Sequence, residues 1–560
     1  MKWCNFFNKI SLILQALGCA VLYFVIEAIC RHSFTEAWTY MTTKPLVFAY
    51  NAAFIFTTML IVYLFRKRIF WRIFVGSLWL FLGIVNGVLL LNRVTPFTGP
   101  DVKNLTDGLS IAKKYLTHTQ MTIGAVLLGI AVLILLIILI RSPKYRGKLK
   151  YKVNIPLVLV GVLAFGGITQ LALEKRVLSN YFGNIAIAYE DYGYPYCLAT
   201  TIFNTGISAP RDYSKSEIKR IEKSEENLPE TKEGSHPNIL FLQLESFFDP
   251  TLVNYLELSE DPIPNFRKLM KEYSSGYYKV PSVGAGTANT EFESITGMSL
   301  HYFGPGEYPY KSILKETTCE SAPYVLKNLG YTAHAVHNNE ANFYGRRSIF
   351  PNLGFDTFTS VEYMWPDNYT PMDWVKDSVL TDEIATALDS TNSQDFVFTV
   401  SVQGHGSYPT DSSVNYTHHV TISSDAITDE EYLNQLSYYV NQLYEMDQFI
   451  GDLVDMLRNR HEPTILVMYG DHCPSLDLTN DMLSSGTIYD TEYFIWNNAG
   501  LKFNWQDMQA YEMGSTLLSA LEIPDGAINA YHQNSGRQLK DGDITEEEYL
   551  SGLKELEYDI

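Results

Sequence analysis

The chain has 560 residues, with 42 Lys or Arg, 62 Asp or Glu and six cysteines, too few and too scattered to form a disulfide framework. Residues 1–214 hold 21 basic and 8 acidic side chains, whereas the remainder holds 21 and 54. The acidic second part excludes nucleic-acid binding, because phosphate contacts along a nucleic acid need clustered Lys and Arg.

Five apolar segments precede residue 180, at about 10–30, 45–65, 70–92, 120–140 and 155–173. Each has about the 20 residues that a helix needs to cross a bilayer. A single segment of this kind could be a buried helix, but five in succession disfavour that interpretation. The first is also too long for the apolar region of a signal peptide and has no convincing cleavage site. We therefore expect a transmembrane domain of five helices over residues 1–175.

Basic residues mark the flanks that stay in the cytoplasm. They gather before the first segment, between the second and third, and between the fourth and fifth: Lys2, Lys9; Arg66, Lys67, Arg68, Arg72; Arg141, Lys144, Arg146, Lys148, Lys150, Lys152. This pattern predicts a cytoplasmic N-terminus, and five crossings then place everything after the fifth segment outside the cell.

Residues 176–237 are predicted to form a juxtamembrane connector and a charged linker, the latter at 214–237. From 238 to 560 short apolar runs alternate with helical patterns. Strands are expected at 238–244, 332–337, 396–402, 464–470 and 492–496, with a long helix at about 429–459. Such nearly continuous apolar strands are typical of a parallel sheet covered on both faces, which predicts an extracellular α/β domain.

Polar residues follow several of these strands. Glu245 comes after the first strand, Asp471 and His472 follow another, and Thr287 follows a Gly-rich loop. Because ligand-binding groups collect at the carboxyl ends of parallel strands, these side chains are expected to converge. Carboxylates with one imidazole suit Mn²⁺, Mg²⁺ or Zn²⁺.

Thr287 is the candidate nucleophile of this group. A threonine hydroxyl needs a base or a metal ion to become reactive at neutral pH. The helix predicted to begin there also favours an anionic phosphoryl group at its N-terminus. The alternative is that Thr287 is only a helix N-cap in a Gly-rich turn.

A second polar group is predicted around His337, Tyr344 and Arg346, with His405 at the end of a further strand. Arg346 could hold a phosphate oxygen, Tyr344 could contact a small polyol, and His405 could transfer a proton. The alternatives are arginines paired with the abundant acids and a histidine exposed in a turn.

The motifs LESFFDP, GAGTANTEFE, HNNEANFYGRR, SVQGHGSYP and YGDHCP resemble those of the lipoteichoic acid synthase family, within the alkaline phosphatase and sulfatase superfamily. This resemblance covers nearly the whole chain and implies a sulfatase-like fold. It implies that Glu245, Thr287, Asp471 and His472 bind one divalent ion, usually manganese. It also implies that the glycerophosphate group is contacted by His337, Tyr344, Arg346 and His405. The family commonly has tryptophan at the Tyr344 position.

The resemblance further implies a reaction. Glycerophosphate would pass from phosphatidylglycerol through Thr287 to a polyglycerolphosphate chain, at the membrane of a Gram-positive bacterium. Alternatives are a phosphoethanolamine or phosphoglycerol transferase that modifies a surface glycan or glycolipid, and a non-catalytic membrane sensor or binding protein. A true sulfatase is disfavoured, because the GAGTANTE loop lacks the C/S-x-P-x-R context that such enzymes need.

Overall fold

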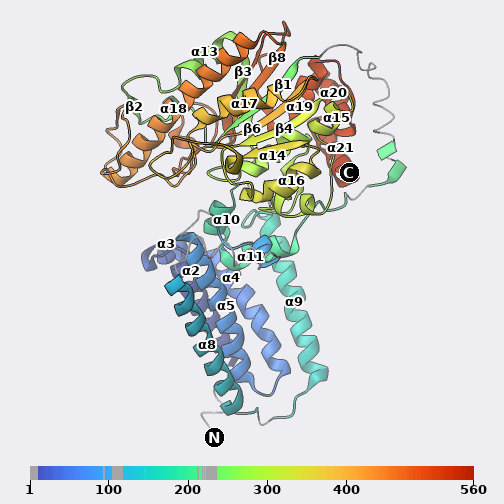
Figure 1. The fold of residues 1–560 in the computed structure, drawn as a ribbon. Coiled ribbons are helices and arrows are strands. Elements are labelled where there is room, and N and C mark those ends of the chain that lie inside the picture. Colours follow the sequence, from blue (N-terminus) through green and yellow to red (C-terminus); the bar gives the residue numbers. More distant parts are fainter. Residues whose placement is uncertain are drawn as a thin grey trace. The chain divides into compact units, whose positions relative to one another are not determined.

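The structure is a computed structural model that describes residues 11–91, 95–103, 118–145, 147–180, 182, 184–210, 213–216, 218, 219, 221 and 236–559. The chain divides into two compact units (Figure 1). One comprises Met1–Thr205 with Gly304–Gly306, and the other comprises Gly206–Phe303 with Glu307–Ile560. Lys2, Lys9, Arg146 and most of the predicted linker lie outside the described residues. The predicted domain limits at residues 175 and 237 stay predictions.

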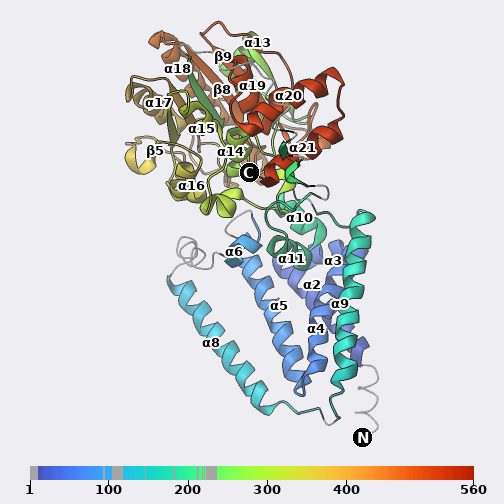
Figure 2. The same ribbon diagram turned by 90° about the vertical axis from the view of Figure 1, so that its right-hand side faces the viewer.

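Among its described residues, the first unit contains five helices that are long and apolar enough to cross a membrane (Figure 2). The spans are Ser11–Cys30 (α2), Pro45–Leu64 (α4, Pro45–Met59, and the 3-10 turn after it), Arg68–Leu90 (α5), Met121–Arg141 (within α8, His118–Arg141) and Tyr151–Glu174 (α9). All five predicted segments are confirmed as helices.

Short helices complete this unit: α3 (Phe34–Thr43), α6 (Gly99–Lys103), α10 (Ile185–Tyr192) and α11 (Tyr194–Phe203). Polar groups of the long helices hold α10 and α11. The Glu27 carboxylate accepts a hydrogen bond from the Tyr194 backbone N–H at 3.2 Å, and Asn51 donates to the Tyr192 carbonyl at 2.8 Å. The backbone groups exposed where α10 ends and α11 begins are thereby satisfied.

The second unit is built on an eight-stranded sheet in the order β10-β3-β9-β8-β1-β6-β4-β5. The strands are β1 (Asn238–Leu244), β3 (Ser274–Lys279), β4 (Thr332–His337), β5 (Thr357–Ser360), β6 (Asp395–Val400), β8 (Thr464–Gly470), β9 (Asp490–Asn497) and β10 (Met508–Gln509). A separate pair consists of β2 (Glu257–Leu258) and β7 (Ile422–Ser423). Strands β8, β1, β6, β4 and β5 run parallel to one another, so their carboxyl ends meet at one edge.

Helices cover both faces of this sheet. Along β1, Ile239 and Phe241 enter one apolar core while Leu240 and Leu242 enter the other, as the alternation of a strand requires. The first core lies under α14 (Thr287–Thr296), α15 (Ala322–Lys327), α16 (Arg346–Asn352), α19 (Met513–Ala520), α20 (Ala527–Asp541) and α21 (Glu546–Asp559). The second lies under α13 (Pro264–Glu272), α17 (Leu380–Asp389) and α18 (Glu430–Arg460). The predicted α/β fold is confirmed.

The sheet differs from the predicted one in three respects, the first being that β3, β5 and β10 were not predicted. Strand β9 pairs antiparallel with both β8 and β3, so the sheet is mixed rather than wholly parallel. Strand β6 ends at Val400, so His405 lies in the loop beyond the strand and not at its end. The backbone N–H of His405 instead donates to the Val402 carbonyl in a turn, at 3.0 Å.

Candidate functional site

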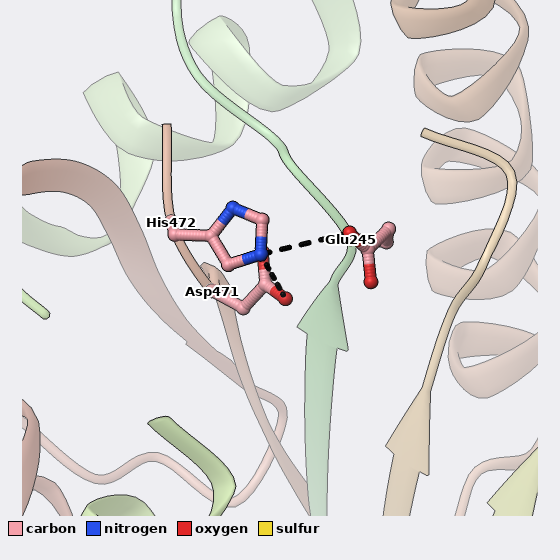
Figure 3. A group of neighbouring side chains, drawn as sticks. All are labelled: Glu245, Asp471 and His472. Atoms are coloured by element: carbon pink, nitrogen blue, oxygen red, sulfur yellow. Dashed lines mark ion pairs between the residues drawn. The ribbon is translucent and has the colours of Figure 1, made fainter. Parts of the chain in front are cut away.

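Glu245, Asp471 and His472 lie together at the carboxyl ends of β1 and β8 (Figure 3). His472 Nε2 is 3.7 Å from Glu245 Oε1 and 3.5 Å from Asp471 Oδ2. One ligand atom from each residue falls within 4.8 Å of the others, and all three side chains are buried. The predicted convergence of these residues is therefore what the structure shows.

Two glycines allow the chain segments after these strands to approach closely. A Cβ at position 470, directly before Asp471, would lie 2.0 Å from the Phe247 carbonyl oxygen. A Cβ at position 404, directly before His405, would lie 2.1 Å from the Glu245 carbonyl oxygen. Any side chain at either position would therefore separate the loops that carry the site.

The group offers the ligand atoms that a divalent metal ion needs. Asp471 Oδ2 and His472 Nε2 are buried and have no hydrogen-bond partner among the residues that the structure describes. His472 Nδ1 donates to the Cys473 carbonyl at 2.9 Å, so Nε2 carries the free lone pair. Burial, and then the nearby Glu245 carboxylate, raise the pKa of Asp471 well above its usual value. Two carboxylates and one imidazole so arranged fit a divalent cation, which would offset their mutual repulsion.

Thr287 is directed at this group by a backbone turn. It is the first residue of α14, and Gly286 before it has φ +107°, which an L side chain rarely adopts. Thr287 Oγ1 donates a hydrogen bond to Glu245 Oε2 at 3.0 Å. The N-cap position belongs to Gly286 and not to Thr287, so the alternative of Thr287 as an N-cap is wrong. Its hydroxyl contacts Glu245 rather than capping α14.

Arg346 and His337 lie behind the loop after β4 and are both buried. The Arg346 guanidinium pairs with Glu291 through Nε, at 3.1 Å, and through Nη2. Its Nη1 donates to His337 Nε2 at 3.0 Å, while His337 Nδ1 donates to the Val400 carbonyl at 2.9 Å. Burial, and then the guanidinium charge, hold the pKa of His337 well below its usual value. The histidine is therefore neutral. For Arg346, the ion pair with Glu291 matches the stated alternative, in which the arginines pair with acidic side chains.

Tyr344 and His405 are the more accessible members of the predicted substrate-contacting set. The Tyr344 ring stacks on Tyr308 with 5.8 Å between ring centroids, and the Arg346 guanidinium lies 5.2 Å from its centroid. His405 Nδ1 contacts the Gly406 carbonyl, and its ring lies 4.4 Å from that of Trp374. Tyr344 thus places an aromatic ring beside the Arg346 guanidinium.

Sequence reasoning missed residues that orient this site. The Ser246 N–H donates to Asp471 Oδ1 at 2.7 Å, and its hydroxyl donates to Glu245 Oε1 at 3.0 Å. Ser401 Oγ accepts from the Glu245 N–H at 2.9 Å. Glu291 carried a usable signal, because it lies four residues after Thr287 and thus on the same face of α14. Ser401 and Trp374 carried none.

The sequence model of the sulfatase family matches residues 237–523. The chain is 30% identical over 289 residues to a Rhizobium meliloti protein named for the modification of cyclic β-1,2-glucan, an alignment that covers 52% of this chain and 44% of that protein. It is 24% identical over 243 residues to lipoteichoic acid synthase 1 of Bacillus subtilis, over 42% of this chain and 36% of the synthase. The chain thus spans less than half the length of these curated relatives.

Among solved structures, the phosphoglycerol transferase GacH of Streptococcus pyogenes, in complex with sn-glycerol-1-phosphate, has the same fold. The TM-score is 0.54 at 21% identity, over 63% of this chain and 95% of that structure. The expected relationship to the alkaline phosphatase and sulfatase superfamily is confirmed. Because the family match covers more than half of the 560 residues, the chain belongs to the sulfatase family.

Proposed function

We propose that this chain is a membrane-anchored, metal-dependent phosphoglycerol transferase that uses Thr287 as its nucleophile. The observation that carries the proposal is the contact of Thr287 Oγ1 with Glu245, beside the unpartnered atoms of Asp471 and His472. A hydroxyl held against a prospective metal site is arranged for phosphoryl transfer rather than for structural capping. The same contacts argue against a non-catalytic sensor, which has no need of them.

In the first step the Thr287 oxygen attacks the phosphorus of phosphatidylglycerol. The new Thr287 O–P bond forms as the P–O bond to diacylglycerol breaks, and Thr287 loses its hydroxyl proton to solvent. Protonated His405 gives a proton to the departing alkoxide, so neutral diacylglycerol leaves. Glycerophosphate is then esterified to Thr287.

In the second step an acceptor hydroxyl attacks the same phosphorus. The Thr287 O–P bond breaks, His405 takes the proton of the acceptor, and Thr287 regains a proton from solvent. Because His405 Nδ1 already contacts the Gly406 carbonyl, Nε2 is the atom available to take that proton. The two steps together return Thr287 and His405 to their starting states.

Glu245, Asp471, His472 and Thr287 would hold one divalent ion, with Mn²⁺ the first candidate and Mg²⁺ or Zn²⁺ the others. When bound, this ion would stabilise negative charge that develops on the transferred group. His337, Tyr344 and Arg346 would form the wall of the glycerophosphate pocket. The Arg346 charge is offset by Glu291, so this pocket suits a singly charged diester.

The donor explains the architecture. Phosphatidylglycerol resides in a membrane, and five spanning helices would keep the catalytic domain at the same surface as its substrate. The proposal places the N-terminus in the cytoplasm and residues 238–560 outside the cell. Since the curated relatives come from both Rhizobium meliloti and Bacillus subtilis, a Gram-positive source stays a prediction.

Two classes of acceptor suit this reaction. A polyglycerolphosphate chain would make the protein a lipoteichoic acid synthase, like the named Bacillus subtilis relative. A surface glycan or glycolipid would make it a glycan-modifying transferase, and the relative named for glucan modification favours this second candidate. Phosphoethanolamine is the alternative transferred group.

The test uses full-length protein in detergent with Mn²⁺ and fluorescent phosphatidylglycerol. We expect release of labelled diacylglycerol and, after brief exposure, a glycerophosphoryl adduct on the Thr287 peptide by mass spectrometry. Thr287→Ala should lower release by at least about a thousandfold, as loss of a nucleophile does. Equal release from Thr287→Ala would reject the nucleophile. If an adduct forms only with phosphatidylethanolamine, the transferred group is phosphoethanolamine and not glycerophosphate.

A further inference from the structure

Exposed aromatic side chains gather on one loop of the catalytic unit. We call residues 361–374, which follow β5, the aromatic loop. Within it Tyr363 is 72% exposed, Trp365 is 94% exposed and Tyr369 is 52% exposed. Each of these rings carries a large apolar surface, and their gathering on one loop makes that loop a candidate binding surface.

The backbone orients two of these rings together. Met364 is extended, at φ −95° and ψ 164°, and its side chain is buried in the second core. Tyr363, the last residue of a 3-10 turn, and Trp365 flank Met364, and both are exposed where Met364 is buried. The remainder folds back on itself, with Tyr369 paired to Val375 and the Thr370 N–H donating to the Trp374 carbonyl at 2.7 Å.

Both ends of the aromatic loop are fixed to the candidate site. At its start, the Val361 N–H donates at 3.1 Å to the carbonyl of Asn339, two residues after His337. Three residues after its end, Asp377 Oδ1 accepts the N–H of Gln403 at 3.2 Å, and Gln403 lies two residues before His405. Trp374 closes the connection, since its ring lies 4.4 Å from the His405 ring. The exposed rings and the proton-transferring histidine therefore belong to one continuous structure.

The charge of the loop restricts the kind of ligand. Residues 361–374 contain Glu362, Asp367 and Asp373 but no Lys, Arg or His. Acidic groups repel a polymer of phosphodiesters and an anionic lipid surface alike. They accept hydrogen bonds from hydroxyl groups, and the C–H face of a sugar ring packs on an aromatic ring. The combination suits a neutral saccharide.

We propose that the aromatic loop binds a neutral saccharide and presents one of its hydroxyl groups to the Thr287 site. This inference rests on the proposed transfer reaction and names its acceptor class as a glycan rather than a glycerophosphate polymer. Stacking on exposed rings would hold successive sugars of a chain, while Trp374 marks the end of the platform nearest to His405.

The experiment measures binding and transfer with full-length protein in detergent. The probes are neutral oligosaccharides of glucose, galactose, N-acetylglucosamine and rhamnose, compared with polyglycerolphosphate and with phosphatidylglycerol vesicles. By calorimetry we expect wild type to bind at least one neutral oligosaccharide. Trp365→Ala should bind it about tenfold more weakly, a usual cost of removing an aromatic contact residue. Its KM for that acceptor should rise in proportion, while diacylglycerol release without acceptor stays unchanged.

Trp505→Ala is the matched control. Trp505 is also exposed, at 58%, but precedes β10 at the opposite edge of the sheet from β5. This variant should bind the saccharide like wild type. Unchanged melting temperatures in both variants would confirm that the fold is intact.

Several outcomes would overturn the inference. The inference is wrong if wild type binds no neutral oligosaccharide, or if Trp365→Ala binds one as tightly as wild type does. It is also wrong if wild type binds polyglycerolphosphate more tightly than any saccharide and this binding depends on Trp365, or if Trp365→Ala loses only the binding of vesicles. Failure of the proposed function has a different signature. In that case wild type releases no diacylglycerol and forms no Thr287 adduct, whatever it does with saccharides.

Discussion

The candidate metal site buries two carboxyl groups close to each other. Glu245 and Asp471 lie beside His472, and the described residues place no cationic partner against Asp471 Oδ2. Such a cluster is costly to bury unless a cation joins it. The consequence is that metal binding should be visible as stability, independently of catalysis.

We therefore expect chelation to lower the melting temperature of the wild-type protein and Mn²⁺ to restore it. A ligand present at a thousand times its Kd adds about 4 kcal/mol to the free energy of unfolding. Asp471→Asn should remove most of this metal-dependent shift, because a ligand charge is lost. Thermal unfolding with EDTA and with each metal measures it, and a melting temperature unaffected by EDTA in wild type would contradict the expectation.

The Glu291–Arg346 pair offers a second test on single residues. Both side chains are fully buried, so Glu291→Gln leaves a guanidinium charge without its partner. Breaking such a pair costs about 3–5 kcal/mol. Glu293→Gln on the same helix is the control, since burial raises the pKa of Glu293 to about 8 and the residue is already neutral at pH 6. Chemical denaturation at pH 6 should separate the two variants; equal stabilities would show that the pair is not important for folding.

Helix α14 is the element on which the site depends most. It begins with Thr287, pairs with Arg346 through Glu291, and near its C-terminus places Glu293 in the core. Glu293 Oε1 accepts the Leu300 N–H at 2.8 Å, and the neighbouring Glu557 of α21 accepts the Ser299 N–H at 2.6 Å. Glu557 thus fixes the segment after α14 to α21, while Glu293 fixes the same segment to α14 itself.

This arrangement predicts a pH dependence. The pKa of Glu293 is raised by burial from about 4.5 in the unfolded chain to about 8 in the fold. Folding therefore takes up a proton between these values, and the stability it contributes at low pH is lost as pH rises toward and through 8. We expect the melting temperature to fall between pH 6 and 9, and less steeply in Glu293→Gln. The difference between the two proteins isolates this residue, and parallel curves would refute the assignment.

A strand could be predicted from the sequence where its own residues are mostly apolar. Strands β1, β4, β6, β8 and β9 are apolar runs and were predicted from sequence. Strand β3 reads SSGYYK and was missed, because its polar residues show no apolar pattern. The antiparallel direction of β9 also escaped prediction, since pairing direction depends on the connecting loops and not on the strand itself.

The site was predicted to a similar extent and for similar reasons. Glu245, Asp471 and His472 follow buried strands, so topology alone brings them together. The contact between Glu291 and Arg346 joins residues 55 positions apart and depends on side-chain geometry that a sequence pattern does not encode. Trp374 reaches His405 through a loop with no regular period.

The whole molecule combines an apolar first unit with a strongly acidic remainder. Residues 215–560 carry 54 acidic and 21 basic side chains, and the proposed donor is an anionic lipid. Repulsion between like charges should therefore oppose productive encounter with a membrane rich in phosphatidylglycerol.

Salt should relieve this repulsion, because the Debye length falls from about 10 Å at 0.1 M to about 3 Å at 1 M. We expect the KM for phosphatidylglycerol in anionic micelles to decrease as NaCl is raised from roughly 50 to 300 mM, because the added salt screens the repulsion. In micelles where the donor is dilute among zwitterionic lipid, the effect should be smaller. A KM that rises with salt in both kinds of micelle would argue that specific ionic contacts attract the donor instead.

The single helical turn between Thr287 and Glu291 has a consequence for how the protein can diverge. One residue inserted in that turn would rotate Glu291 by about 100° relative to Thr287 and detach it from Arg346. Substitutions can change the residues of this turn one at a time, but an insertion or deletion there would disrupt the proposed nucleophile and the proposed glycerophosphate pocket at once. Length variation among descendants of this gene should therefore be absent from residues 287–291 and concentrate in loops such as 361–374.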